Sequence, residues 1–247
     1  MRITYRLFNS MNNLTPGWNR RNCTKRADCI DCDIRKSALF STLSEAELIY
    51  LVQPVLTFQH EAHIRLYEEG ETGSHAYTVR KGIIKLVKTI PNGEQRIVRL
   101  TSRSDFIGLE ILLVQPYRHT AISVTPVELC KIPVEVLKGL DERNPSFSKQ
   151  LMTRWQKNVD DAESMITDLS TGKAASRLAH LILRYFSDGL AEVWNSPARD
   201  DIASMLGVTT ETASRLMAEF KREGLISEEH GRIAIQDFVA LKSIADN

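Results

Sequence analysis

One segment, residues 144–169, constrains the fold of this 247-residue chain more than any other. Asn144 followed by Pro145 is typical of a helix start, because the asparagine can cap the helix and proline fits its first turn. Apolar residues then recur at alternating steps of three and four, at Met152, Trp155, Val159, Ala162, Ile166 and Leu169. This spacing is that of a two-helix seam, so we expect the helix to pair with a second copy of itself. The alternative is an ordinary helix packed on its own domain.

Composition places the chain among folded proteins, and the pattern of apolar residues argues against a secreted protein and a membrane-spanning one. Hydrophobic residues make up 43% and charged residues 26%, as in a globular protein of one large or two ordinary domains. The first eleven residues lack the apolar run of a secretory signal, and no run of about 18 apolar residues could cross a membrane. We therefore expect no membrane partner and a cytoplasmic location, where thiols stay reduced.

Three cysteines fall within ten residues, at Cys23, Cys29 and Cys32. Two residues separate Cys29 from Cys32, so one turn of chain can direct both sulfurs at a single metal, and Cys23 can loop back as a third ligand. The chain has one further cysteine, Cys130. Four sulfur ligands fit Zn²⁺ or an iron–sulfur cluster. The alternative is an accidental Cys-x-x-Cys spacing.

The charge around these cysteines is positive. Residues 1–36 contain eight Lys or Arg and three Asp. Nearby cations favour thiolate over thiol and would offset part of the negative charge of a thiolate-ligated cluster. We interpret residues 1–40 as a cysteine-bearing arm.

Residues 41–143 are predicted to form a strand-rich domain. A capping box at residues 44–47 opens a short helix, and Pro91-Asn-Gly-Glu94 is typical of a hairpin turn. Short alternating stretches punctuated by glycine predict a small β-barrel or jelly roll. A strand over residues 127–132 would hold Cys130 either as the anchor of the N-terminal arm or as a small buried hydrophobe.

Residues 171–247 are predicted to form a winged helix-turn-helix. Gly207 suits the turn between two helices, and Thr209 or Thr210 can cap the second one. The exposed face of that second helix would contact bases or phosphates in a major groove through Glu211, Ser214 and Arg215. A hairpin around His230-Gly231 would form the wing.

Bulk charge does not support DNA binding by this domain. Residues 171–235 contain eight Lys or Arg and nine Asp or Glu. The prediction therefore depends on the pattern of turn, caps and polar face, and an ordinary helical hairpin is the alternative.

In the order of its parts the chain resembles the Crp/Fnr family of bacterial transcription regulators, and within it the FNR-like oxygen sensors. Glu211, Ser214 and Arg215 match the Glu-x-x-Ser-Arg pattern of that branch, and Leu129-Cys-Lys-Ile-Pro133 resembles the stretch that carries its fourth cluster ligand. The resemblance implies an α+β fold, with a cyclic-nucleotide-binding-like β-roll (jelly roll), a dimerisation helix over residues 144–170 and a C-terminal winged helix-turn-helix. It also implies a [4Fe–4S] cluster held by Cys23, Cys29, Cys32 and Cys130.

The same resemblance implies the partners of the chain. It would act as a homodimer on double-stranded DNA, at an inverted repeat of TTGAT-like half-sites, and it would contact RNA polymerase. The expected function is a regulator, not an enzyme, that switches with oxygen or nitric oxide.

The chain departs from the family pattern at three places. Enteric members space their N-terminal cysteines by two and then five residues, whereas here the order is five and then two. Gly108-Leu-Glu110 and His119-Thr120 stand where the cyclic-AMP branch has Gly-Glu and Arg-Ser, so no arginine would hold a cyclic phosphate and we do not expect cyclic-nucleotide binding. Ala162 lies near the place where an aspartate opposes pairing in enteric members, which would make the dimer less dependent on its cluster.

Three alternatives stay open at this point. A regulator of the same fold could hold zinc or leave its cysteines metal-free. A haem sensor would use other ligands, for which His60, His63, His75 and His119 are available. An enzyme with a cysteine nucleophile would need a neighbouring base, and residues 23–32 contain no histidine.

Overall fold

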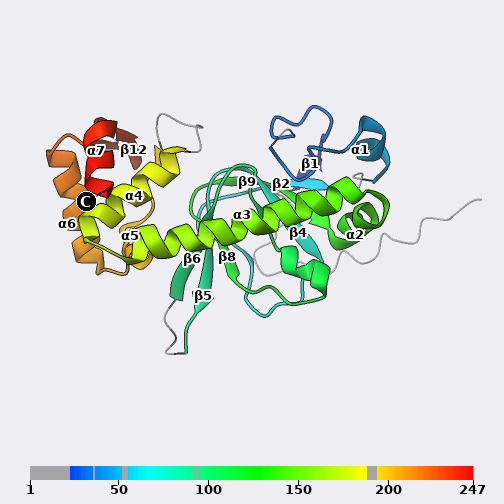
Figure 1. The fold of residues 1–247 in the computed structure, drawn as a ribbon, viewed down its shortest axis with the longest axis horizontal. Helices are drawn as coiled ribbons and strands as arrows, with labels where there is room; N and C mark the ends of the chain where they lie inside the picture. The colour runs from blue at the N-terminus through cyan, green and yellow to red at the C-terminus, as the bar shows by residue number, and fades with distance from the viewer. Residues whose placement is uncertain are drawn as a thin grey trace, which may run out of the picture.

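The chain folds into two parts that are joined by one long helix (Figure 1). A computed structural model describes residues 23–35, 37–51, 55–91, 93, 95–187 and 194–246. The N-terminal part holds a five-stranded and a four-stranded sheet, and the C-terminal part combines helices with a small three-stranded sheet. The predicted α+β fold, with a sheet-rich domain, a long helix and a helix-turn-helix, is therefore confirmed.

Two antiparallel sheets form the N-terminal β-roll. The first has the strand order β1-β2-β9-β4-β7 and the second the order β3-β8-β5-β6. Their strands are β1 (Cys23–Arg26), β2 (Leu56–His60), β3 (Arg65–Tyr67), β4 (His75–Lys81), β5 (Ile84–Thr89), β6 (Gln95–Thr101), β7 (Phe106–Ile107), β8 (Thr120–Ser123) and β9 (Val127–Pro133). Both sheets contribute to one apolar core, in which Leu66, Val79, Leu86 and Leu129 are buried.

Local sequence signals account for the ends of several elements in this part. The capping box forms at α1 (Glu45–Leu51), where the Ser44 amide donates to the Glu47 carboxylate at 2.8 Å and the Glu47 amide donates back to Ser44 Oγ at 3.3 Å. β5 and β6 pair as the predicted hairpin. At its turn Gly93 adopts a φ of +86°, while Asn92 and Glu94 lie outside the described residues.

The long helix is α3 (Pro145–Ser170), and it runs past both parts of the molecule (Figure 1). The Asn144 side chain caps it by accepting a hydrogen bond from the Ser146 amide at 3.0 Å, as predicted. At one end Phe147 is buried in the β-roll core, and at the other Met165 and Leu169 are buried in a second core. The preceding helix α2 (Val134–Arg143) and the 3-10 helix η2 (Leu109–Leu113) were not predicted.

The C-terminal part contains the predicted winged helix-turn-helix. Its elements are α4 (Ala174–Ser187), β10 (Trp194–Asn195), α5 (Arg199–Leu206), α6 (Thr210–Arg222), β11 (Ile226–Glu229), β12 (Arg232–Ile235) and α7 (Phe238–Ala245). β11 and β12 form the wing, and His230 and Gly231 take positive φ at its tip. Helix α7 was not predicted, although Asp237 caps it by accepting from the Ala240 amide at 2.9 Å.

The two parts share the second core. Ile83, Val87 and Ile97 of the β-roll are buried together with residues of α3, α4, α5 and α6. The C-terminal part is therefore packed against the β5–β6 hairpin as well as joined to it through α3. Among the described helices, we find none that is both long and apolar enough to cross a membrane.

Candidate functional site

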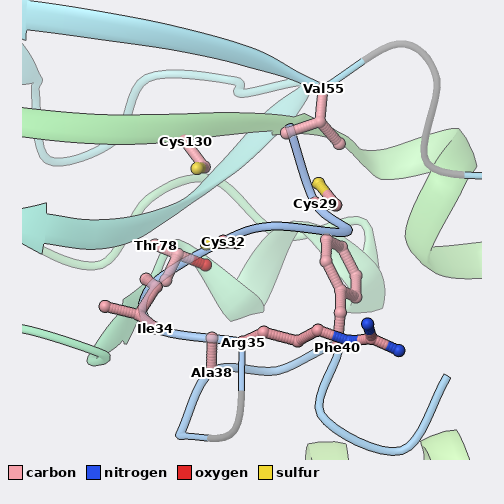
Figure 2. Close-up of a pocket in the computed structure, with 9 residues that line it drawn as sticks. All are labelled: Cys29, Cys32, Ile34, Arg35, Ala38, Phe40, Val55, Thr78 and Cys130. Atoms are coloured by element: carbon pink, nitrogen blue, oxygen red, sulfur yellow. The ribbon is translucent and has the colours of Figure 1, made fainter. Parts of the chain in front are cut away.

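Three of the four cysteines line one cavity (Figure 2). Cys29 and Cys32 come from the segment that follows β1, and Cys130 comes from the middle of β9. The other residues that line this cavity are Ile34, Arg35, Ala38, Phe40, Val55 and Thr78. The fold therefore brings together cysteines that are about one hundred residues apart in the sequence.

The fourth predicted ligand is only partly described. The backbone of Cys23 forms the start of β1 and pairs with Phe58 of β2, which in turn pairs with Leu129, the residue before Cys130. The strand that carries Cys23 thus belongs to the same sheet as Cys130. Its side chain lies outside the described part of the structure, so its role as a ligand stays a prediction.

Burial governs the protonation of these thiols. Desolvation, with smaller contributions from Cys32 and Asp28, raises the pKa of Cys29 to about 11. Desolvation, followed by the charges of Cys29 and Cys32, raises the pKa of Cys130 to about 12. Arg80 acts in the opposite direction but does not outweigh burial. Of the eight cations in residues 1–36, only Arg35 has a described side chain, so the expectation that these cations favour thiolate stays a prediction.

The donor set consists of sulfur atoms, which both Zn²⁺ and iron–sulfur clusters take as ligands. Within the described residues, no three His, Cys, Asp or Glu side chains converge closely enough to hold one metal ion. A cluster of several irons and sulfides is larger, so its ligands surround a volume and need not meet at a point. Three thiols around a largely apolar cavity, with Cys23 on the neighbouring strand, have the composition of such a ligand set.

The cysteine-bearing segment is fastened to the first sheet by charges. Asp33, the residue after Cys32, pairs with Arg80 of β4 at 2.9 Å and with Arg103 at 2.8 Å. Hydrogen bonds from Arg80 and then Arg103 lower the pKa of Asp33 below its ordinary value. Arg80 also pairs with Glu128 of β9 at 2.7 Å, two residues from Cys130. Arg80 therefore links the two sides of the cysteine cavity.

The same segment reaches α3. Arg154 of α3 donates a hydrogen bond to the carbonyl oxygen of Ser37. Phe40 stacks on Phe147 of α3 with ring centroids 6.3 Å apart, and the hydroxyls of Ser37 and Ser104 lie 2.6 Å from each other. A movement of this segment would therefore directly change the contacts that α3 makes through Arg154 and Phe147.

A chain of ion pairs continues from this point to the C-terminal part. Asp105, in the loop that contains Arg103, pairs with Lys157 of α3. Lys157 also lies 3.3 Å from Asp161, one turn further along the helix. Asp161 pairs with Arg184 of α4 at 2.8 Å. These contacts connect the β-roll, the middle of α3 and the first helix of the C-terminal part. Sequence reasoning did not identify the pairs of Asp105 with Lys157 and of Asp161 with Arg184, because they join distant residues.

A second face of α3 carries the predicted seam. Four of the six seam residues are exposed to solvent, at 73%, 46%, 41% and 64% for Met152, Trp155, Val159 and Ile166, and Ala162 is half-buried beside them. Leu169 differs from the prediction, because it is 1% exposed and packs within this chain in the second core. The stripe that is available to a second copy therefore ends at Ile166.

The predicted DNA-reading residues lie together on α6. Glu211, Ser214 and Arg215 are all exposed, while Ala213, Leu216 and Met217 face the second core. Thr209 caps α6 by accepting from the Thr212 amide at 3.2 Å. Thr210 is also exposed, and its hydroxyl donates to the Asp200 carboxylate of α5 at 2.7 Å. Of the two candidate caps, Thr209 is therefore the one used.

Aromatic side chains fill part of the interior of the β-roll. Tyr67 stacks on Tyr117 with centroids 3.9 Å apart and on Tyr77 at 5.8 Å. The Tyr117 hydroxyl donates to the His75 carbonyl at 2.5 Å. Tyr117 also lies so close to Gly73 that a side chain there would begin 2.2 Å from its ring. The three tyrosine rings occupy space inside the β-roll, and that space is not available to a ligand.

The histidines of the haem alternative lie on separate elements. His60 is on β2, His63 is in the turn that follows, His75 begins β4 and His119 precedes β8. Desolvation by burial is the main cause that lowers the pKa of His60, His75 and His119. His60, His75 and His119 are therefore neutral side chains built into the β-roll at neutral pH.

Comparison with known proteins agrees with this architecture. The family model of the cyclic nucleotide-binding domain matches residues 58–144, and that of the Crp-like helix-turn-helix domain matches residues 176–244. An "Anaerobic regulatory protein" of Pasteurella multocida is 29% identical over 225 residues, which are 86% of this chain and 81% of that protein. The "Fumarate and nitrate reduction regulatory protein" of Vibrio cholerae is 28% identical over 229 residues, which are 88% and 90% of the two chains.

A solved structure shows the same fold. FixK2 from Bradyrhizobium japonicum superimposes with a TM-score of 0.70 at 21% identity, covering 77% of this chain and 96% of that one. Sheet-rich domain, long helix and helix-turn-helix therefore occur together, and in this order, in proteins of similar length.

Proposed function

Because this chain belongs to the Crp/Fnr family of DNA-binding transcription regulators, we propose that it senses oxygen or nitric oxide through a [4Fe–4S] cluster. The observation that carries the proposal is the meeting of Cys29, Cys32 and Cys130 around one cavity. With Cys23 these residues would hold the cluster. When bound, it would supply an oxygen-labile link between the N-terminal segment and β9.

The residues of this chain would transmit the state of that link. Thiolates held together at the cavity keep Asp33 against Arg80 and Arg103, and Ser37 against Arg154 of α3. Release of the thiolates would leave these half-exposed pairs to hold the segment alone, and such pairs are individually weak. Contacts of the segment with α3 would then loosen. The two states differ in these contacts, which is what a signal needs in order to shift their populations.

We propose that two copies pair through the exposed stripe on α3. Met152, Trp155, Val159 and Ile166 present apolar surface that this chain does not cover, and Ala162 permits close approach between them. Pairing would place two copies of α6 on one side of the dimer. Two such helices suit successive turns of a palindromic DNA site.

Glu211, Ser214 and Arg215 would read the bases of each half-site. Their exposure on one face of α6 supports this role, and the Glu-x-x-Ser-Arg pattern favours a TTGAT-like half-site. Such a protein acts where DNA and RNA polymerase are, so we infer that it works in the cytoplasm and contacts the polymerase. It is proposed as a regulator without enzymatic turnover.

Two measurements on anaerobically purified protein test the cluster. A broad visible absorption band with about four irons and four sulfides per chain, bleached by air, is expected. Cys29→Ser and Cys130→Ser should lower the iron content, whereas Ile30→Ser, which changes the exposed residue beside Cys29, should keep it. A colourless protein, or one that holds zinc and is indifferent to air, would overturn the proposal while leaving DNA binding untouched.

A further inference from the structure

The charge of the C-terminal part does not explain how it holds DNA. Residues 171–247 contain nine Lys or Arg and eleven Asp or Glu, a net charge of −2. Affinity for DNA comes largely from cations that neutralise phosphates and release counterions. A cation from another part of the chain, placed beside α6, would add positive charge that the C-terminal part, with its net charge of −2, does not supply.

The β5–β6 hairpin of the β-roll is a source of such cations. Residues 84–101 contain four Lys or Arg, at positions 85, 88, 96 and 99, and one acidic residue, Glu94, which gives a net charge of +3. The hairpin lies beside the C-terminal part (Figure 1), and its residues Val87 and Ile97 share the second core with α5 and α6.

Polar contacts fix the hairpin on α5. The Lys85 ammonium pairs with the Asp201 carboxylate, and the two side chains are only 16% and 9% exposed. Ser204 donates from its hydroxyl to the carbonyl oxygen of Gln95 at 3.4 Å. Arg96, the next residue on β6, is thereby held at a defined place against the helix-turn-helix.

Three of the four cations of the hairpin are occupied within the β-roll or at its contact with α5. Lys85 pairs with Asp201, Lys88 pairs with Glu69 at 3.0 Å, and Arg99 is buried and donates to the Phe106 carbonyl. Arg96, by contrast, is exposed. Its Nη1 atom lies 3.6 Å from the point where a side chain on Gly207 would begin.

Gly207 is the turn of the helix-turn-helix, and the exposed Thr209 and Thr210 follow it at the start of α6. The Arg96 guanidinium therefore lies at the end of α6 that enters a major groove, where the phosphates of the groove edge pass. We propose that Arg96 binds a phosphate of the DNA backbone there, so that the β-roll itself takes part in holding DNA. This inference rests on the DNA-reading half of the proposed function and is independent of the cluster.

The test is the salt dependence of DNA binding by Arg96→Gln, measured by fluorescence anisotropy on an FNR-like palindrome and on random duplex DNA. Each phosphate contact contributes about 0.9 to the slope of log K against log salt. We expect the slope to fall by about 0.9 for one lost contact per dimer, or about 1.8 for two. At 0.1 M salt this corresponds to an affinity loss of about 8-fold to about 60-fold.

Arg65→Gln is the matched control, because Arg65 lies on β3, at the edge of the same sheet that is opposite to β6. It should leave the slope unchanged. Arg96→Lys should keep most of the slope, since a lysine also neutralises a phosphate. The ratio of palindrome to random affinity should stay the same in Arg96→Gln, because a phosphate contact carries no sequence information.

A structural role for Arg96 as a brace of the turn would give a different result. Arg96→Gln would then lower affinity at an unchanged slope, and Arg96→Lys would not restore it. That outcome, or an unchanged affinity, would overturn the inference. Failure of wild-type protein to prefer the palindrome would instead contradict the base-reading part of the proposed function.

Discussion

Arg103 and Asp33 form an ion pair of 2.8 Å between the loop after β6 and the residue that follows Cys32. Two residues further along that loop, Asp105 pairs with Lys157 of α3. The cysteine cavity and the long helix are therefore joined through one short loop. We therefore expect the ion pairs of Asp33 to transmit a change at the cysteines to α3, and this expectation can be tested by mutation.

Asp33→Asn should weaken the response without removing the ligands. Each half-exposed pair is worth about 0.2–1 kcal/mol, so losing those with Arg80 and Arg103 should lower the anaerobic affinity for operator DNA by about two- to thirtyfold. Iron content should stay at the wild-type level. Asp31→Asn, in the same segment and also exposed, is the control, and an equal effect of both variants would refute the route.

Trp155→Glu should convert dimers to monomers. The substitution places a carboxylate in the middle of the exposed stripe, where pairing would have to desolvate it twice, so we expect the dissociation constant to rise by about 100-fold or more. Sedimentation equilibrium measures this. Thr153→Glu adds the same charge at an exposed position outside the stripe and should leave the dimer intact. If neither variant changed the dissociation constant of the dimer, the dimer contact would lie outside the stripe on α3.

Arg215→Ala should relax specificity. A base contact by an arginine is worth about 1–3 kcal/mol of discrimination, so the preference for the palindrome over a variant site should fall by that amount. Arg222→Ala, at the exposed last turn of α6, should not change the preference. Competition binding with single-base variants identifies the position that is read. A preference identical to wild type would remove Arg215 from the base-reading set.

Acid should destabilise the fold over the pH range in which His75 is protonated in the unfolded chain but not in the folded one. Burial, with a contribution from Lys131, lowers the pKa of His75 from 6.5 to about 4 in the folded chain. Below pH 6.5 the unfolded chain binds a proton that the folded chain does not, so the free energy of unfolding falls with pH until about pH 4. The contribution is at most about 3 kcal/mol. Urea unfolding at several pH values measures it, and His75→Gln should flatten the dependence.

Gly73→Ala should destabilise the β-roll. The added carbon would lie 2.2 Å from the Tyr117 ring, which is held by its stack on Tyr67 and its hydrogen bond to the His75 carbonyl. We expect a loss of about 1–3 kcal/mol in urea unfolding. Gly139→Ala, inside α2 with open space around it, should instead stabilise by up to about 1 kcal/mol. Equal effects would show that Tyr117 can move aside.

Several elements could be predicted from the sequence because their signals are local. Asn144 and Pro145 define the start of α3, residues 44–47 form their capping box, and Gly207 with Thr209 marks the turn and cap of the helix-turn-helix. Each of these depends on bonds between neighbours in the chain. The order of parts, and with it the family, follows from such signals.

Only the tertiary structure decided which residues meet across the chain. Periodicity marks the apolar side of α3 but not what covers it, so it could not separate the exposed Ile166 from the buried Leu169. The meeting of Cys130 with Cys29 and Cys32 depends on where β9 lies in its sheet, between β2 and β4. Burial by that packing is the first cause that raises the pKa of Cys29 and Cys130, and it depends on the tertiary structure.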